Sequence, residues 1–243
     1  MSSLKAEMNA LCNEVAAEFA NWSFVSEKFK NRTLKHTDLM VSPCFTFQGG
    51  SDNPGCSMQP AVEVAHKRTI KLYQEIFGVK PSRTSFMRFQ TVRNLLHEYP
   101  ENLRFQGHVW LRRRPFVVTG IDKQEPWPKT WIGFDEAKPA IKGMLADGIT
   151  LIEKYYDLSS EENLLRNLPP KYVPAVGENE EMEGGLGVMV CVARILLGDF
   201  DFVEHYRSDD YKTLRPKRIN ELDIIIAALP ELKRRFAETG KVV

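Results

Sequence analysis

The sequence has few cysteines, no long apolar run and none of the short motifs that mark common enzymes. Its four cysteines among 243 residues form no CxxC pair, which is typical of reduced thiols in a cytoplasm rather than of a disulfide framework. No stretch approaches the roughly 20 apolar residues that cross a bilayer. Residues 1–20 also lack the basic start and apolar block of a secretory signal. We therefore expect a cytoplasmic protein with no membrane association.

The motifs that hold phosphates, catalytic zinc or a nucleophilic serine are missing as well. The chain contains no GxxxxGK[ST], no GxGxxG after a strand, no HExxH and no GxSxG. Residues 184–190 (GGLGVMV) are rich in glycine but include no lysine that would reach a phosphate. Cys191 lies in an apolar helical pattern, where a thiol is usually inert. The sequence thus predicts no catalytic residue, no metal and no cofactor, and it favours a protein that is not an enzyme.

Charge is nearly balanced overall but is unevenly distributed along the chain. Residues 1–120 hold 16 Lys and Arg against 10 Asp and Glu, a net of +6, whereas residues 121–243 hold 17 against 22, a net of −5. An ordinary solvated surface accounts for this difference. The alternative is a pair of oppositely charged surfaces, of which the acidic one attracts a basic partner.

Hydrophobic periodicity predicts an α+β fold, with an N-terminal antiparallel sheet and helices followed by a helical C-terminal half. Strands are predicted over 22–30, 39–48, 57–66, 103–118 and 128–134. Helices are predicted over 4–20, 67–77, 85–100, 138–156 and 216–238, with Pro230 kinking or splitting the last. Residues 186–208 are predicted to form a buried helix, a Gly-Asp turn and the start of a second helix. We expect residues 1–134 to form the sheet and helix region and residues 135–243 to pack on it as one compact unit. Gly143 and Gly148 weaken their helix and suggest close helix packing.

Two further segments have distinctive composition. Ser159 or Ser160 is expected to cap a short helix that begins with Glu161 and Glu162. Residues 171–185 hold two acidic clusters flanked by glycines and are predicted to form a mobile loop.

The segment 49–56 has the composition of a binding loop, a metal site or a turn. Its glycines, Asp52, Asn53 and Pro54 are the residues that tight turns require. Cys44, Cys56 and His66 offer three zinc donors, but a structural zinc site needs four ligands with tight spacing. We therefore predict that residues 49–56 connect a hairpin and bind no metal.

Two other groups of residues leave alternative functions open. His205 lies among acidic residues and is a candidate acid–base centre, although no positioned nucleophile accompanies it. Arg112–Arg114, with aromatic residues nearby, are candidates for contacts to nucleic acid. The near-neutral total charge argues against nucleic-acid binding.

Several segments resemble a bacterial family of uncharacterised function. The N-terminal ones are FANWSFVSEKFKN, LKHTDLMVSPCFTFQGG and SMQPAVEV, and the C-terminal ones are YYDLSSEENLLRNLPPKY and LLGDFDFVEHYRSDD. Some members of that family look like immunity proteins encoded beside polymorphic toxins. The resemblance implies a non-catalytic protein that neutralises a toxin by direct binding.

If the partner is a basic toxin, the acidic C-terminal half is the expected contact surface. The predicted partner-binding residues are Glu178, Glu180, Glu181, Glu183, Asp199, Asp201, Glu204, Asp209 and Asp210.

Overall fold

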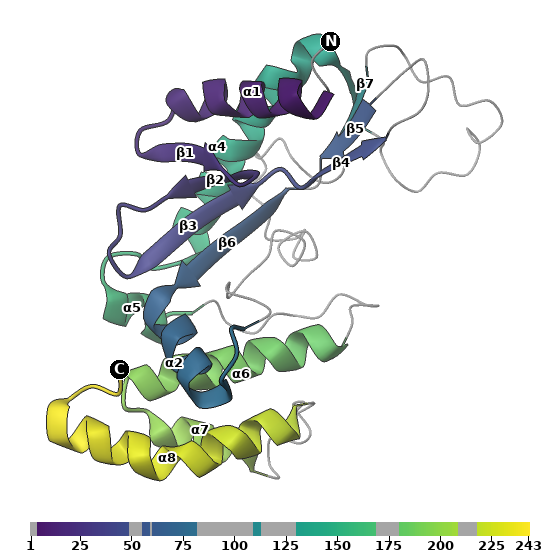
Figure 1. Cartoon of the computed structure of the whole chain (residues 1–243). Coiled ribbons are helices and arrows are strands. Elements are labelled where there is room, and N and C mark those ends of the chain that lie inside the picture. The colour runs from purple at the N-terminus through teal and green to yellow at the C-terminus, as the bar shows by residue number, and fades with distance from the viewer. Residues whose placement is uncertain are drawn as a thin grey trace. The chain divides into compact units, whose positions relative to one another are not determined.

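The computed structural model describes residues 4–48, 55–58, 60–81, 109–112, 130–168, 180–208 and 218–243. The helices are α1 (Leu4–Ala17), α2 (Lys67–Phe77), α4 (Ala137–Tyr155), α5 (Glu161–Arg166), α6 (Glu180–Leu196), α7 (Phe200–Arg207) and α8 (Ile219–Thr239) (Figure 1). The strands are β1 (Trp22–Val25), β2 (Lys28–Asn31), β3 (Thr37–Ser42), β4 (Phe45–Gln48), β5 (Gly55–Met58), β6 (Ala61–His66), β7 (Val109–Arg112) and β8 (Thr130–Gly133). This arrangement confirms the predicted α+β class.

The strands form two four-stranded sheets. The first has the order β1-β2-β3-β6, and the second has the order β4-β5-β7-β8. Neighbours are antiparallel for β1–β2, β2–β3, β4–β5 and β5–β7, whereas β7 and β8 run parallel. The predicted strand over 39–48 is therefore two strands, which pair in different sheets. The break falls after Pro43, where Cys44 adopts a positive φ of 44°.

The predicted hairpin around residues 49–56 is confirmed by its flanking strands. Phe45 pairs with Met58 and Gln48 pairs with Gly55 in antiparallel register. Gly55 and Cys56 belong to β5 rather than to the turn, and residues 49–54 lie outside the described residues. The predicted helix over 85–100 also lies outside them.

The contacts divide the chain into two compact units, each assembled from three segments. Unit 1 comprises Met1–Thr33, Leu39–Val62 and Leu95–Ile152, and unit 2 comprises Leu34–Asp38, Glu63–Asn94 and Glu153–Val243. Each unit thus contains residues from both sides of position 134. That residues 1–134 and 135–243 are the two regions of one compact unit stays a prediction.

Unit 1 has its core between α1, the β2–β3 pair and α4. Met8 and Cys12 of α1, Phe29 of β2, Val41 of β3 and Leu145 of α4 are all fully buried. Gly148 of α4 lies against Val41, because an added Cβ there would be 2.7 Å from both γ-carbons of that valine. The predicted close packing at Gly148 is therefore present, and its partner is a strand.

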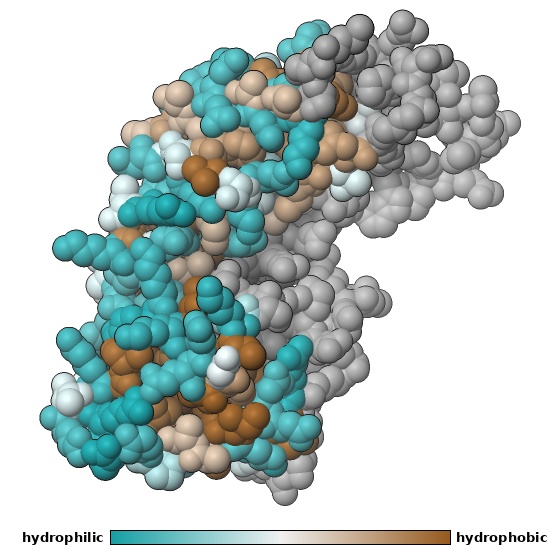
Figure 2. All heavy atoms as spheres, in the orientation of Figure 1, coloured by the Kyte–Doolittle hydropathy of each residue, from teal (hydrophilic) through white to brown (hydrophobic). Residues whose placement is uncertain are grey.

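Unit 2 is built from helices around α6. Helix α6 contacts α2, α5, α7 and α8, and α7 contacts α8 (Figure 1). Five different helices each contribute a buried side chain to this core: Leu72, Leu164, Val192, Val203 and Ile225. On the visible surface, hydrophobic atoms gather among hydrophilic ones over the region of α2, α7 and α8 (Figure 2).

Three boundaries in the C-terminal half differ from the predictions or refine them. Helix α6 begins at Glu180, so the loop predicted for 171–185 is wrong for its last six residues. Ser160 caps α5, because its hydroxyl accepts a hydrogen bond from the backbone N–H of Asn163 at 3.0 Å. Helix α8 continues through Pro230, which removes one backbone hydrogen bond without dividing the helix.

Candidate functional site

The predicted acidic surface is only partly described. Glu178, Asp209 and Asp210 lie outside the described residues. Glu180, Glu181 and Glu183 belong to the N-terminal part of α6.

The acidic residues of α7 are engaged with cations and backbone of the same chain. Asp199 caps α7 by accepting a hydrogen bond from the backbone N–H of Phe202 at 3.3 Å, and it pairs with Arg194 at 3.4 Å. Glu204 pairs with Lys233 of α8 at 2.6 Å. Asp201 is exposed in the first turn of α7. Asp199 and Glu204 therefore already stabilise the local structure.

The antiparallel packing of α6 and α7 separates the acidic residues into two groups. Tyr206, near the end of α7, lies over Gly187, since a Cβ added to Gly187 would collide with its hydroxyl. Glu180–Glu183 therefore belong to the same end of this helix pair as residue 208. Asp199, which pairs with Arg194, lies toward the opposite end, and the stretch of α6 from Glu183 to Arg194 is roughly 16 Å long at about 1.5 Å per residue.

Between these two ends runs a stack of half-buried side chains that the sequence analysis did not identify. The guanidinium carbon of Arg194 lies 5.0 Å from the ring centroid of Phe202. The rings of Phe202 and Tyr206 are stacked, with centroids 5.9 Å apart and planes inclined by 23°. The signal was present in the sequence, because Phe202 and Tyr206 are four residues apart and share one side of a helix. We call Arg194, Phe202 and Tyr206 the α7 stack.

A second group of interacting side chains surrounds His66, the last residue of β6 and the N-cap of α2. Its Nδ1 accepts a hydrogen bond from the backbone N–H of Thr69 at 3.2 Å and lies 2.8 Å from the Thr69 hydroxyl. Its Nε2 lies 2.9 Å from a carboxylate oxygen of Glu161 in α5. A nitrogen that accepts from a backbone N–H carries no proton. The ring is therefore the neutral tautomer that donates from Nε2 to Glu161.

Electrostatics agree with this assignment. Burial lowers the pKa of His66 below its ordinary value, and the opposing influence of Glu161 only partly compensates. Burial alone would raise the pKa of Glu161, but the hydrogen bond from His66 and the charge of Arg68 outweigh it and lower that pKa. Arg68 donates to Glu161 at 3.2 Å and to the backbone oxygen of Val243 at 3.3 Å.

The order hydroxyl, imidazole and carboxylate in this cluster resembles a nucleophile with its base and acid. A catalytic hydroxyl must touch its substrate. Thr69 and His66 are both fully buried, with 0% of their surface exposed. The cluster therefore holds β6, α2 and α5 together and is closed to a substrate.

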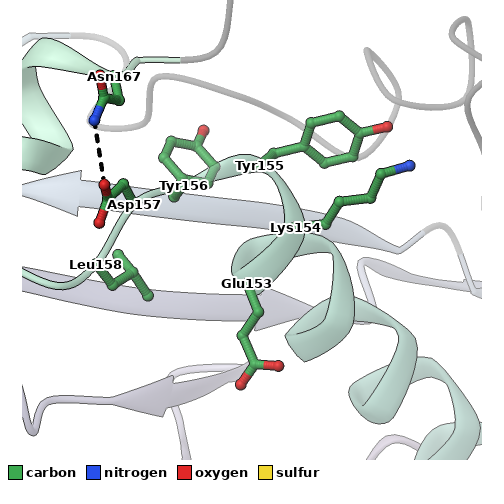
Figure 3. Close-up of a pocket in the computed structure, with 7 residues that line it drawn as sticks. All are labelled: Glu153, Lys154, Tyr155, Tyr156, Asp157, Leu158 and Asn167. Carbon is green, nitrogen blue, oxygen red and sulfur yellow. Dashed lines mark hydrogen bonds between the residues drawn. The ribbon is translucent and has the colours of Figure 1, made fainter.

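A pocket of about 570 Å³ lies where α4 ends (Figure 3). It is lined by Glu153, Lys154, Tyr155, Tyr156, Asp157, Leu158 and Asn167. Asn167 donates to Asp157 at 3.2 Å, and Asp157 also accepts from the backbone N–H of Ser159 at 3.1 Å. Hydrogen bonds from the side chain and backbone of Ser159 lower the pKa of Asp157. This carboxylate therefore fixes the turn before α5.

The structure gives little support for metal binding or nucleic-acid contacts at the residues that the sequence offered for them. Cys44 is exposed and Cys56 is buried, and burial raises the pKa of Cys56 to about 12, which disfavours the thiolate that zinc requires. Among the residues that the structure describes, no three His, Cys, Asp or Glu side chains are grouped to hold a metal ion. Arg112 ends β7 between Gly55 and Gly133, and Arg113 and Arg114 fall outside the described ranges. His205 is exposed on α7.

Comparisons with other proteins leave the family open. Searches against protein-family models, curated proteins and solved structures found no match to this chain. The helices in the described part of the chain include none that is long and apolar enough to cross a membrane.

Proposed function

We propose that this chain acts by binding another protein rather than by catalysis, and that the α7 stack is the centre of its contact surface. The observation that supports this function is the alignment of Arg194, Phe202 and Tyr206, which are half-buried and stacked in sequence. Arginine, tyrosine and other aromatic residues are enriched where binding energy concentrates in protein interfaces.

The stack is also prepared for binding. Its members are held by one another and by the close contact of Tyr206 with Gly187, so a partner would immobilise few additional rotamers. Asp199 and Asp201 lie at one end of the stack and Glu180–Glu183 belong to the other. An aromatic centre with charged residues around it has the anatomy of a typical interface.

The charge of this surface indicates the class of partner. In this proposal the acidic residues at both ends steer a basic protein toward the stack. A toxin that acts on nucleic acid carries basic surface because its substrate is anionic. The resemblance of the chain to immunity proteins points to the same partner, a bacterial toxin that is neutralised by direct contact.

Site-specific photocrosslinking tests where a partner binds. A photoreactive amino acid at His205, beside the stack, should capture one protein in cells, whereas the same group at the exposed Ser23 of β1 should not. The captured protein is then purified, and Phe202→Ala should weaken its binding by roughly 30-fold or more, the effect of a typical hot spot. Thr150→Ala, an exposed change on α4, serves as the control and should leave the affinity unchanged.

The outcome that contradicts the proposal is equally specific. Unchanged affinity for a Phe202→Ala variant that still folds, measured by circular dichroism and denaturant midpoint, removes the stack from the interface. A loss of affinity on Arg112→Ala instead would place the contact surface on β7.

The acidic residues are tested separately by ionic strength. The Debye length falls from ~30 Å at 0.01 M to ~8 Å at 0.15 M salt, so a steered complex should associate more slowly as salt rises. A variant with Glu178, Glu180, Glu181 and Glu183 changed to Gln should associate more slowly at low salt and depend less on salt. An association rate that is unchanged by salt and by these substitutions would show that the four glutamates do not steer the partner.

A further inference from the structure

We infer that the His66–Glu161 joint is an acid-sensitive latch, which caps α2 at the β6–α2 junction while His66 is neutral and releases that cap when the ring is protonated. This inference concerns the stability of unit 2 and does not depend on the proposed partner. It rests on three contacts of one fully buried imidazole.

Only the neutral ring can accept a hydrogen bond at Nδ1 while it donates one from Nε2. Nδ1 accepts from the backbone N–H of Thr69 and thereby caps α2, while Nε2 donates to Glu161. Adding a proton to Nδ1 places one donor against another. The backbone N–H of Thr69 then loses its acceptor in a site with no solvent-exposed surface, and a buried donor without a partner destabilises the fold.

The charged groups around His66 come from three segments. Glu161 approaches from α5, Arg68 from α2, and His36 from the segment before β3, with its ring centroid 6.1 Å from that of His66. Glu161 favours a charged ring, whereas His36 and Arg68 oppose it. Because Arg68 already pairs with Glu161 at 3.2 Å, the carboxylate that would compensate a charged His66 is shared.

The latch connects elements that are distant in sequence. His66 ends β6, and Glu161 begins α5 directly after its cap Ser160. Protonation of this single side chain therefore removes the cap of α2, whereas Nε2 still donates to Glu161 at the start of α5.

The direction of the pH dependence follows from linkage. The pKa of His66 is lowered on folding from an ordinary value of 6.5, so the unfolded chain binds the proton more readily. The contribution of His66 is fully present above about pH 6.5 and is lost as pH falls toward the folded pKa. Over that window one such group lowers the folding equilibrium constant by up to about tenfold per pH unit.

The experiment compares denaturant unfolding of the full chain and of His66→Asn between about pH 7.5 and 5.5. Asparagine offers a side-chain oxygen that can cap α2 but does not titrate. We expect the parent to lose stability with falling pH and His66→Asn to be less stable at pH 7.5 but flatter. His36→Gln is the matched comparison: it removes one of the groups that oppose a charged His66 but leaves the three contacts of that ring, so it should flatten the curve much less than His66→Asn does. Parallel curves for the parent and His66→Asn would overturn the inference.

A second measurement decides the question if His66→Asn does not fold. The ¹⁵N shifts of the His66 ring in the parent should show an unprotonated Nδ1 and a protonated Nε2 at pH 7.5. They should also show that the ring gains its second proton only below the ordinary value of 6.5, together with loss of the native signals of α2. A proton on Nδ1, or titration that leaves those signals unchanged, would refute the latch.

Discussion

Gly148 of α4 provides the sharpest test of the packing in unit 1. Replacing a helical glycine by alanine ordinarily stabilises a helix by about 1 kcal/mol. Here the new Cβ would lie 2.7 Å from Cγ1 and Cγ2 of Val41, a fully buried residue of β3. Inserting a methyl group into such a packed site costs about 1–3 kcal/mol. We therefore expect Gly148→Ala to be destabilising by about 1 kcal/mol, opposite in sign to helix propensity alone.

A double-mutant cycle separates the two contributions. Val41→Ala removes both γ-carbons, after which the nearest atom of residue 41 would be its Cβ at 3.3 Å. In that background Gly148→Ala should recover most of the free energy that the helix propensity of alanine provides, and it should therefore stabilise the chain. The coupling between the two changes should be about 1–3 kcal/mol, measured from denaturant midpoints at equal slope.

The control lies two residues further along the same helix. Thr150 is exposed, so Thr150→Ala should stabilise α4 by a few tenths of a kcal/mol, through propensity alone. If Gly148→Ala stabilises the chain by about 1 kcal/mol in both backgrounds, α4 does not approach β3 as described and the reasoning is refuted.

Two other predictions follow from burial and from the ligand set of the loop. Leu145→Ala and Leu196→Ala should each lower the unfolding free energy by about 2–5 kcal/mol, because Leu145 of α4 is 0% exposed and Leu196 of α6 is 6% exposed. An unchanged denaturant midpoint for either variant would contradict the buried position of that leucine. Protein purified without chelator should contain no stoichiometric zinc, since burial disfavours the thiolate of Cys56, and about one zinc per chain that is lost on replacing Cys44 or Cys56 would show the hairpin to be a metal site.

The sequence predicted best where local chemistry and long-range packing agree. The change from strand to helix at His66 and Lys67 was placed correctly. Ser160 likewise caps α5 as predicted. At these positions the local preference of the residue and the tertiary packing favour the same backbone conformation.

The misses occur where tertiary packing overrides local preference. Residues 22–30 looked like one strand, but Ser26 and Glu27 adopt positive φ values of 54° and 61° and turn the chain between β1 and β2. Neither residue type favours that conformation. Residues 180–185 looked like a loop because of Gly184 and Gly185, yet helix α6 includes them.

The candidate site was only partly predictable for a related reason. Composition shows where acidic residues occur, but it does not show which of them already have partners. Asp199 and Glu204 contact Arg194 and Lys233, and Lys233 is distant in sequence from Glu204. The fully buried position of His66 beside Glu161 joins residues 95 positions apart, and no local pattern signals such a pair.

The interleaved make-up of the two units has a consequence for how the chain is synthesised. Unit 1 requires residues as late as Ile152, and unit 2 joins Leu34–Asp38 to Glu153–Val243. A ribosome that works from the N-terminus exposes β1, β2 and β3 long before α4 is available to cover Val41. The fragment 1–134, cut at the end of the sheet region, would lack Ile141 and Leu145 and would contain neither unit complete. Partial chains would therefore leave apolar side chains such as Val41 uncovered, and exposed apolar surface of this kind promotes aggregation.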